Sequence, residues 1–145
     1  MPSVRSGRKA PGNNKVHERH SPPAIDRVVF LERIGRDQEL ALGLIDLYLR
    51  NSGDMLSAVS AGVRGRDSES LERAAHQLKG ALGILGAKAA AGSALTLERM
   101  ARNGDLAALD DPYARLASDM ALFEIALANL RHEVYQNLAS PQRSF

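Results

Sequence analysis

The sequence contains no cysteine and no tryptophan, and only six of its 145 residues are tyrosine or phenylalanine. The lack of cysteine excludes disulfide bonds, thiolate zinc sites, iron–sulfur clusters and cysteine nucleophiles. The shortage of aromatic residues argues against a base-stacking surface for single-stranded nucleic acid. No stretch approaches 18 consecutive apolar residues and the N-terminus has no apolar signal-peptide core, so we expect neither a membrane span nor secretion. The expected compartment is the cytoplasm.

Residues that favour strands are scarce as well. Valine, isoleucine and threonine together number 13, against 22 alanines and 20 leucines, which are strong helix formers. With 44% hydrophobic and 25% charged residues, the chain has the composition of a globular domain with a buried core. We therefore predict an all-α domain.

Positive charge is concentrated near the N-terminus. Residues 1–25 carry a net charge of +4, whereas the rest of the chain carries −2. This segment is rich in proline, glycine, serine and asparagine and shows no apolar periodicity. We interpret it as a disordered basic tail or linker, with a nucleic-acid-binding arm as the less favoured alternative. The predicted helical domain spans residues 26–138, and residues 139–145 form a C-terminal tail.

Capping residues and apolar periodicity predict five helices. A short helix over 27–34 would place Val28, Leu31 and Ile34 on its inner side and end at Gly35. The second helix would start after Asp37 and end near Gly65, with Gly53 as a weak point. Its predicted inner face consists of Leu40, Leu44, Leu47, Tyr48, Met55, Val59 and Val63.

The remaining three helices are long and strongly periodic. The third opens at the N-cap Asp67 and ends near Gly86, and the fourth covers about 88–102. The fifth has Asp111 as its N-cap and Pro112 at its first helical position. Their predicted inner faces are Leu71, Ala75, Leu78, Leu82 and Leu85; Ala90, Ala94, Leu97 and Ala101; and Leu116, Met120, Phe123, Leu127, Leu130 and Val134. Four such helices predict an antiparallel four-helix bundle, with the short first helix across one end.

The third helix also carries a distinctive outward stripe. His76 lies about 140° from the centre of the apolar seam and is expected to face solvent. Lys79, Gly80 and Gly83 share this stripe, as do Glu72 and Arg73 one turn earlier. Each glycine inside a helix costs about 1 kcal/mol relative to alanine, so a partner that approaches His76 closely would explain them. Histidine is a nucleophile near pH 7 that can accept a phosphoryl group, and the Lys79 ammonium can offset the added negative charge.

The run His-Gln-Leu-Lys-Gly-Ala at 76–81, followed by Leu-Gly-Ala at 85–87, resembles the signature of histidine-containing phosphotransfer (HPt) domains of bacterial phosphorelays. The match extends over about residues 26–135. Further matching features are Leu-Tyr-Leu at 47–49, Asp67, Leu97-Glu98 and Asn-Gly-Asp at 103–105. The sequence departs from the pattern at Gly53, where many members have proline, and at Ala81, where serine is frequent.

The resemblance implies a phosphoryl carrier with no kinase activity of its own. His76 would accept a phosphoryl group from the aspartyl phosphate of a response-regulator receiver domain and pass it to an aspartate of another receiver. The expected partners are receiver domains and a hybrid sensor histidine kinase. The receiver would supply the Mg²⁺, so no cofactor is expected in this chain, which has no glycine-rich nucleotide loop. We expect a monomer that binds neither membranes nor nucleic acid.

A second site residue follows from the hairpin geometry. If the third and fourth helices turn near Gly86, Glu98 lies level with His76. The resemblance implies a hydrogen bond between Glu98 and Nδ1 of His76, which would leave Nε2 free to attack. Arg102, one turn further on, is a candidate for contact with the phosphate. The candidate partner-binding residues are Gln77, Gly80, Gly83 and Arg102.

Two alternatives remain at this stage. A helical adaptor that is never phosphorylated could bind receiver or kinase domains through the same stripe, and Glu98 could simply pair with Arg102. A metal site is disfavoured, because a di-iron bundle needs Glu-x-x-His pairs on facing helices and no histidine completes one. His17, His20 and His132 are interpreted as residues without a functional role.

Overall fold

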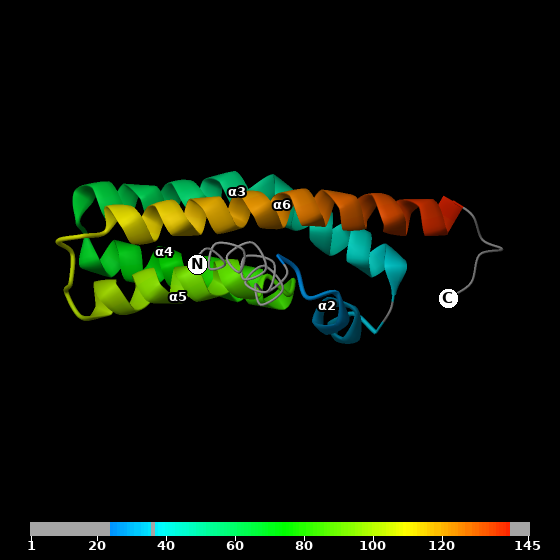
Figure 1. Ribbon diagram of the computed structural model, residues 1–145, viewed down its shortest axis with the longest axis horizontal. Coiled ribbons are helices and arrows are strands. Elements are labelled where there is room, and N and C mark those ends of the chain that lie inside the picture. Colours follow the sequence, from blue (N-terminus) through cyan, green and yellow to red (C-terminus); the bar gives the residue numbers. More distant parts are fainter. Residues whose placement is uncertain (1–23, 36, 140–145) are drawn as a thin grey trace, which may run out of the picture.

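The computed structural model describes residues 24–35 and 37–139. These residues form α2 (Arg27–Arg33), α3 (Gln38–Gly65), α4 (Ser68–Ile84), α5 (Lys88–Arg102) and α6 (Asp110–Ala139). Figure 1 shows α3 to α6 side by side in an elongated bundle, with α2 lying near the end of the α4–α5 hairpin. The predicted all-α fold, a helical bundle with a short extra N-terminal helix, is confirmed.

The inner faces predicted for α4, α5 and α6 are correct. Every residue expected on them is buried in one continuous core. At the start of α4, the side chain of Asp67 accepts a hydrogen bond from the backbone N–H of Ser70, so this N-cap is also as predicted. The buried face of α4 fixes how this helix is rotated and thereby decides which of its residues face solvent.

The inner faces predicted for α2 and α3 are partly wrong. In α2, Phe30 is buried and Val28 is 64% exposed. In α3, Leu40 and Leu47 are about half exposed, because the core face is offset by one residue and uses small side chains. That face consists of Ala41, Ile45, Tyr48, Ser52, Val59, Gly62 and Val63.

The start of α6 also differs from the prediction, because Asp111, the predicted N-cap, lies within the helix. Helix α6 begins at Asp110, and the Leu109 carbonyl accepts the first helical hydrogen bond from Tyr113. Pro112 is therefore the third helical residue rather than the first, which is tolerated because N–H groups in the first turn have no intrahelical acceptor. Helix α3 continues through Gly53 without interruption.

The turn between α4 and α5 is anchored to the segment that enters α2. Gly86 has φ +78°, a left-handed conformation that favours glycine. Its carbonyl accepts a hydrogen bond from the backbone N–H of Asp26 at 2.7 Å, and Lys88 pairs with the Asp26 carboxylate at 3.0 Å. A Cβ on Gly86 would lie only 2.6 Å from the Asp26 carbonyl oxygen. This contact fixes the turn that sets the α4–α5 register.

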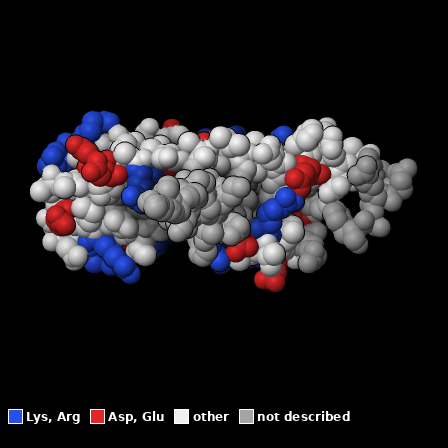
Figure 2. All heavy atoms as spheres, viewed as in Figure 1, with Lys and Arg blue, Asp and Glu red and all other residues white. Residues whose placement is uncertain are grey.

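The described residues extend slightly past the predicted domain limits. Ile25 is buried and Ala139 is the last residue of α6. The tails predicted over 1–25 and 139–145 otherwise lie outside the described residues. No helix in the described part of the chain is long and apolar enough to cross a membrane. On the face seen in Figure 2, positive and negative side chains are mixed, and the coloured residues form no extended basic patch.

Candidate functional site

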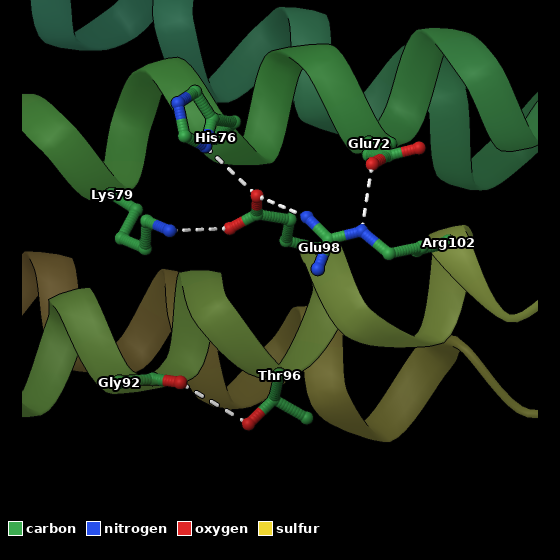
Figure 3. Close-up of polar contacts among 7 residues, drawn as sticks. All are labelled: Glu72, His76, Lys79, Gly92, Thr96, Glu98 and Arg102. Atoms are coloured by element: carbon green, nitrogen blue, oxygen red, sulfur yellow. Dashed lines mark hydrogen bonds and ion pairs between the residues drawn. The ribbon is translucent and has the colours of Figure 1, made fainter.

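His76 lies on the outer face of α4, with its side chain 65% exposed. Its neighbours Ala75 and Leu78 are buried, so the core contacts of α4 hold the backbone while the imidazole projects outward. Figure 3 shows Nδ1 of the ring facing the carboxylate of Glu98, which extends from α5. The structure therefore places His76 where a partner can reach it.

Glu98 is a buried carboxylate, with its side chain only 2% exposed. Its Oε2 lies 2.8 Å from Nδ1 of His76, and its Oε1 lies 2.7 Å from Nζ of Lys79. A terminal nitrogen of Arg102 donates a second hydrogen bond to Oε2, at 2.8 Å. Since an ionised carboxylate only accepts hydrogen bonds, the proton between His76 and Glu98 resides on Nδ1, which leaves the lone pair of the neutral imidazole on Nε2.

Two opposing effects act on the pKa of Glu98. Burial raises this pKa. Hydrogen bonds from Lys79 and His76, together with the Lys79 charge, lower it by a larger amount. The net result is a pKa below the usual value of 4.5, so Glu98 is ionised at neutral pH. The site thus contains a negative charge beside the imidazole at neutral pH.

This ionised carboxylate predicts a specific dependence of stability on acid. Because the folded-state pKa of Glu98 is lowered, its contribution to stability is present above about pH 4.5 and is lost as the pH falls through the folded-state pKa. Urea unfolding of the wild type and of Glu98→Gln, from pH 3 to 7, checks this. The stability difference between them should be constant at neutral pH and should change in favour of Glu98→Gln on acidification. A difference independent of pH would contradict the assignment.

Arg102 links Glu98 to a second carboxylate. Its Nε donates to Oε2 of Glu72 at 2.9 Å, so the guanidinium bridges α5 and α4 (Figure 3). The hydrogen bond that Arg102 donates to Glu72 raises the pKa of Arg102 above its usual value. Helical periodicity places Glu72 on the stripe of His76 but does not by itself predict its partner. The register of the α4–α5 hairpin does predict this partner. Glu72 precedes His76 by one turn and Arg102 follows Glu98 by one turn, so the two lie level with each other.

The charged side chains surround an open hollow of about 430 Å³ beside the imidazole. It is lined by Glu69, Glu72, Arg73, His76, Glu98 and Arg102. On the other side of the stripe, α3 and α4 form an apolar groove of about 410 Å³ whose edge includes Gln77. Its apolar lining includes Leu44, Leu47, Tyr48, Met55, Ala81 and Ile84. The sequence does not predict this groove, because the periodicity of α3 places Leu44 and Leu47 in the core.

The two glycines of the stripe differ in their surroundings. Gly80 is exposed, and a Cβ built on it would meet nothing within 4 Å. Gly83 also has room for a Cβ but is half-buried, and its carbonyl accepts a hydrogen bond from Arg33 of α2 at 3.1 Å. Neither glycine is required by packing against the described residues. Gly80 leaves the surface next to His76 open.

Comparison with known proteins agrees with this geometry. The model of the Hpt domain family matches residues 43–133, which is more than half of the chain. The chain belongs to the Hpt domain family. Hpt domains are phosphoryl carriers of two-component phosphorelays rather than autonomous enzymes, carry no cofactor themselves, and interact with receiver and kinase partners. The family resemblance stated from the motif is confirmed.

A solved structure supports the same assignment. The Hpt domain described here is similar to histidine-containing phosphotransfer protein B (HptB) from Pseudomonas aeruginosa PAO1, with a TM-score of 0.72 and 25% sequence identity. The match covers 78% of this chain and 98% of the HptB chain. Comparison with the sequences of curated proteins found no match.

The other histidines of this Hpt domain lie away from the cluster around Glu98 or outside the described residues. His132 is exposed on α6, and His17 and His20 precede the described residues. Within the described ranges, no group of three or more histidine, aspartate or glutamate side chains is arranged to hold a metal ion. The structure thus brings together His76, Lys79, Glu98 and Arg102, with Gln77 and Gly80 beside them.

Proposed function

We propose that His76 is the phosphoacceptor of this Hpt domain, taking a phosphoryl group from the aspartyl phosphate of one receiver domain and passing it to an aspartate of another. The observation that carries the proposal is the 2.8 Å contact between Nδ1 of His76 and the buried carboxylate of Glu98. It favours one tautomer and one orientation of the ring, with Nε2 on the side of the ring away from Glu98. An exposed histidine without a function needs no such support.

The transfer step follows from this geometry. The Nε2 lone pair attacks phosphorus, an N–P bond forms, and the bond between phosphorus and the aspartate oxygen breaks to release the receiver carboxylate. The imidazole becomes cationic, and the Glu98 carboxylate stabilises that charge through the Nδ1–H hydrogen bond. Lys79 and Arg102 both bind Glu98, the carboxylate that contacts the His76 ring. Their positive charges therefore lie near the ring and can offset the charge of the phosphoryl group. Onward transfer is the reverse of these steps.

The remaining requirements fall on the partner. The receiver would hold Mg²⁺ with its own carboxylates, so that the metal neutralises the phosphoryl oxygens during transfer. We propose that receivers dock over Gln77 and Gly80 and into the adjacent apolar groove, where exposed Leu47 and Ile84 supply hydrophobic contact. A hybrid sensor histidine kinase is the proposed source of phosphate. We further propose that the protein is a cytoplasmic monomer whose partners are these domains rather than nucleic acid or membrane.

Incubation with a phosphorylated receiver tests the assignment. The proposal predicts a label on this chain that is stable in base and labile in acid, as expected for phosphohistidine. A helical adaptor that is not phosphorylated would bind the receiver without acquiring the label. Binding without labelling, in the presence of Mg²⁺, would therefore favour the adaptor and contradict the proposal.

Substitution of Gly80 tests the proposed approach of the receiver. Gly80→Gln should stabilise α4 by a few tenths to about 1 kcal/mol, because a flexible residue is replaced by a better helix former at an exposed position. It should also block phosphoryl transfer, because the new side chain stands beside His76. Gly92→Gln is a matched control, since Gly92 is exposed within α5, has equal room for a Cβ, and lies away from His76 in Figure 3. Equal transfer by both variants would contradict the docking assignment.

Glu98 variants test the orienting role. Glu98→Ala should slow transfer about ten-fold or more without abolishing it, because the nucleophile remains but its tautomer and orientation are no longer fixed. Glu98→Gln keeps an oxygen that can accept from Nδ1–H and should retain more activity than the alanine variant. Single-turnover transfer rates from one receiver distinguish the two. Wild-type rates for Glu98→Ala would show that Glu98 is a structural residue only.

A further inference from the structure

Arg102 is shared by two carboxylates of very different accessibility. Glu98 is buried with its side chain 2% exposed, whereas the Glu72 side chain is 37% exposed and can be solvated by water. Glu72 lies on α4 one turn before His76, on the same outward stripe. Its carboxylate lies 2.9 Å from Nε of Arg102, and both side chains line the hollow beside His76. This ion pair therefore holds the Arg102 guanidinium toward Glu72.

The cluster around His76 is balanced before phosphorylation. Glu72 and Glu98 supply two negative charges, and Lys79 and Arg102 supply two positive charges, each bound to at least one of these carboxylates. A phosphoryl group adds up to about two negative charges near pH 7. Either of the two cations that bind Glu98 must weaken an existing ion pair to approach the phosphoryl oxygens.

The accessibilities decide which ion pair gives way. Moving Lys79 would leave Oε1 of the buried Glu98 without its cation, and an unpaired buried charge is strongly unfavourable. Breaking the contact between Arg102 and Glu72 exposes a carboxylate that water can solvate, and exposed ion pairs contribute little. The guanidinium can keep its hydrogen bond to Glu98 while its Nε side turns toward the phosphoryl group.

We propose that Glu72 is a positioning residue that acts through Arg102 to set how readily phosphorylated His76 gives up its phosphoryl group. This inference rests on the proposed function of His76. By competing for Arg102, Glu72 makes the phosphorylated state less stable than it would otherwise be. Phosphorylated His76 is then a better donor to the receiver aspartate, and the equilibrium between carrier and receiver lies further toward the receiver.

The experiment measures that equilibrium between the full chain and one receiver, using radiolabelled phosphate. Glu72→Gln should shift it toward phosphorylated His76 by about two- to five-fold, the range expected for one exposed ion pair. In an Arg102→Gln background the same substitution should have almost no effect, because the residue through which Glu72 acts is gone. Glu72→Asp should restore an equilibrium close to that of the wild type.

Asp46→Asn provides a matched control. Asp46 also joins two helices through an arginine Nε, that of Arg131, at 2.7 Å, and this ion pair is about as exposed as the pair between Glu72 and Arg102. The Asp46→Asn substitution removes one negative charge on another face, between α3 and α6, and should leave the transfer equilibrium unchanged. Melting temperatures of all variants report any purely structural effect separately.

The outcomes separate the two levels of the proposal. No shift in Glu72→Gln, a shift toward the receiver, or an equal shift with and without Arg102 would each overturn the role of Glu72 while leaving His76 as phosphoacceptor. A wild-type chain that acquires no label would overturn the proposed function and this inference with it.

Discussion

Replacing His76 with glutamine is expected to abolish phosphoryl acceptance while leaving helical content and melting temperature nearly unchanged. The side chain is 65% exposed and contributes no core packing, so the bundle does not depend on it, whereas glutamine has no nucleophilic nitrogen. Transfer from a phosphorylated receiver and thermal unfolding by circular dichroism check the two parts. His132→Gln, at an exposed histidine of α6, should be labelled as the wild type is. Labelling that persists in His76→Gln would assign the phosphoryl group to another residue.

Replacing Gly86 with alanine is expected to destabilise the domain by about 2–4 kcal/mol. The left-handed backbone at φ +78° accounts for about 1–2 kcal/mol, and the contact of the new Cβ with the Asp26 carbonyl, at 2.6 Å, accounts for the rest. Gly104→Ala is the matched control, since Gly104 has φ +72° but a Cβ there meets nothing within 4 Å. Urea unfolding should show a smaller loss for the control. Equal losses would mean that the contact with Asp26 contributes nothing to the turn.

The sequence predicts those helices in which large apolar residues coincide with the core face. In α4 and α6 the stripes of large apolar residues are the buried stripes, and in α5 the predicted alanine-rich stripe is buried as well. In α3 the two diverge, because small residues such as Ala41 and Gly62 face the core while Leu47 faces solvent. Gly62 shows why: a Cβ there would lie 2.9 Å from Cα of Leu71, so its small size is dictated by a helix that only the folded structure places beside it.

The same limit applies to the site. The outward direction of His76 follows from helical periodicity, and its position beside Glu98 follows from the turn between α4 and α5. Both are local features of the sequence. The bridge from Arg102 to Glu72 follows from the same register, whereas the groove between α3 and α4 depends on how those two helices are rotated against each other. Side-chain periodicity of a single helix does not determine that rotation when its apolar residues occupy two faces, as they do in α3.

The most direct test of the account is the position of the phosphoryl group on the imidazole ring. After transfer from a phosphorylated receiver to the ¹⁵N-histidine-labelled chain, ³¹P and ¹⁵N NMR identify which ring nitrogen is bonded to phosphorus. The account predicts one phosphohistidine, at Nε2 of His76, with Nδ1 still protonated and hydrogen-bonded to Glu98. Phosphorus on Nδ1 of His76, or on any other residue, would contradict it.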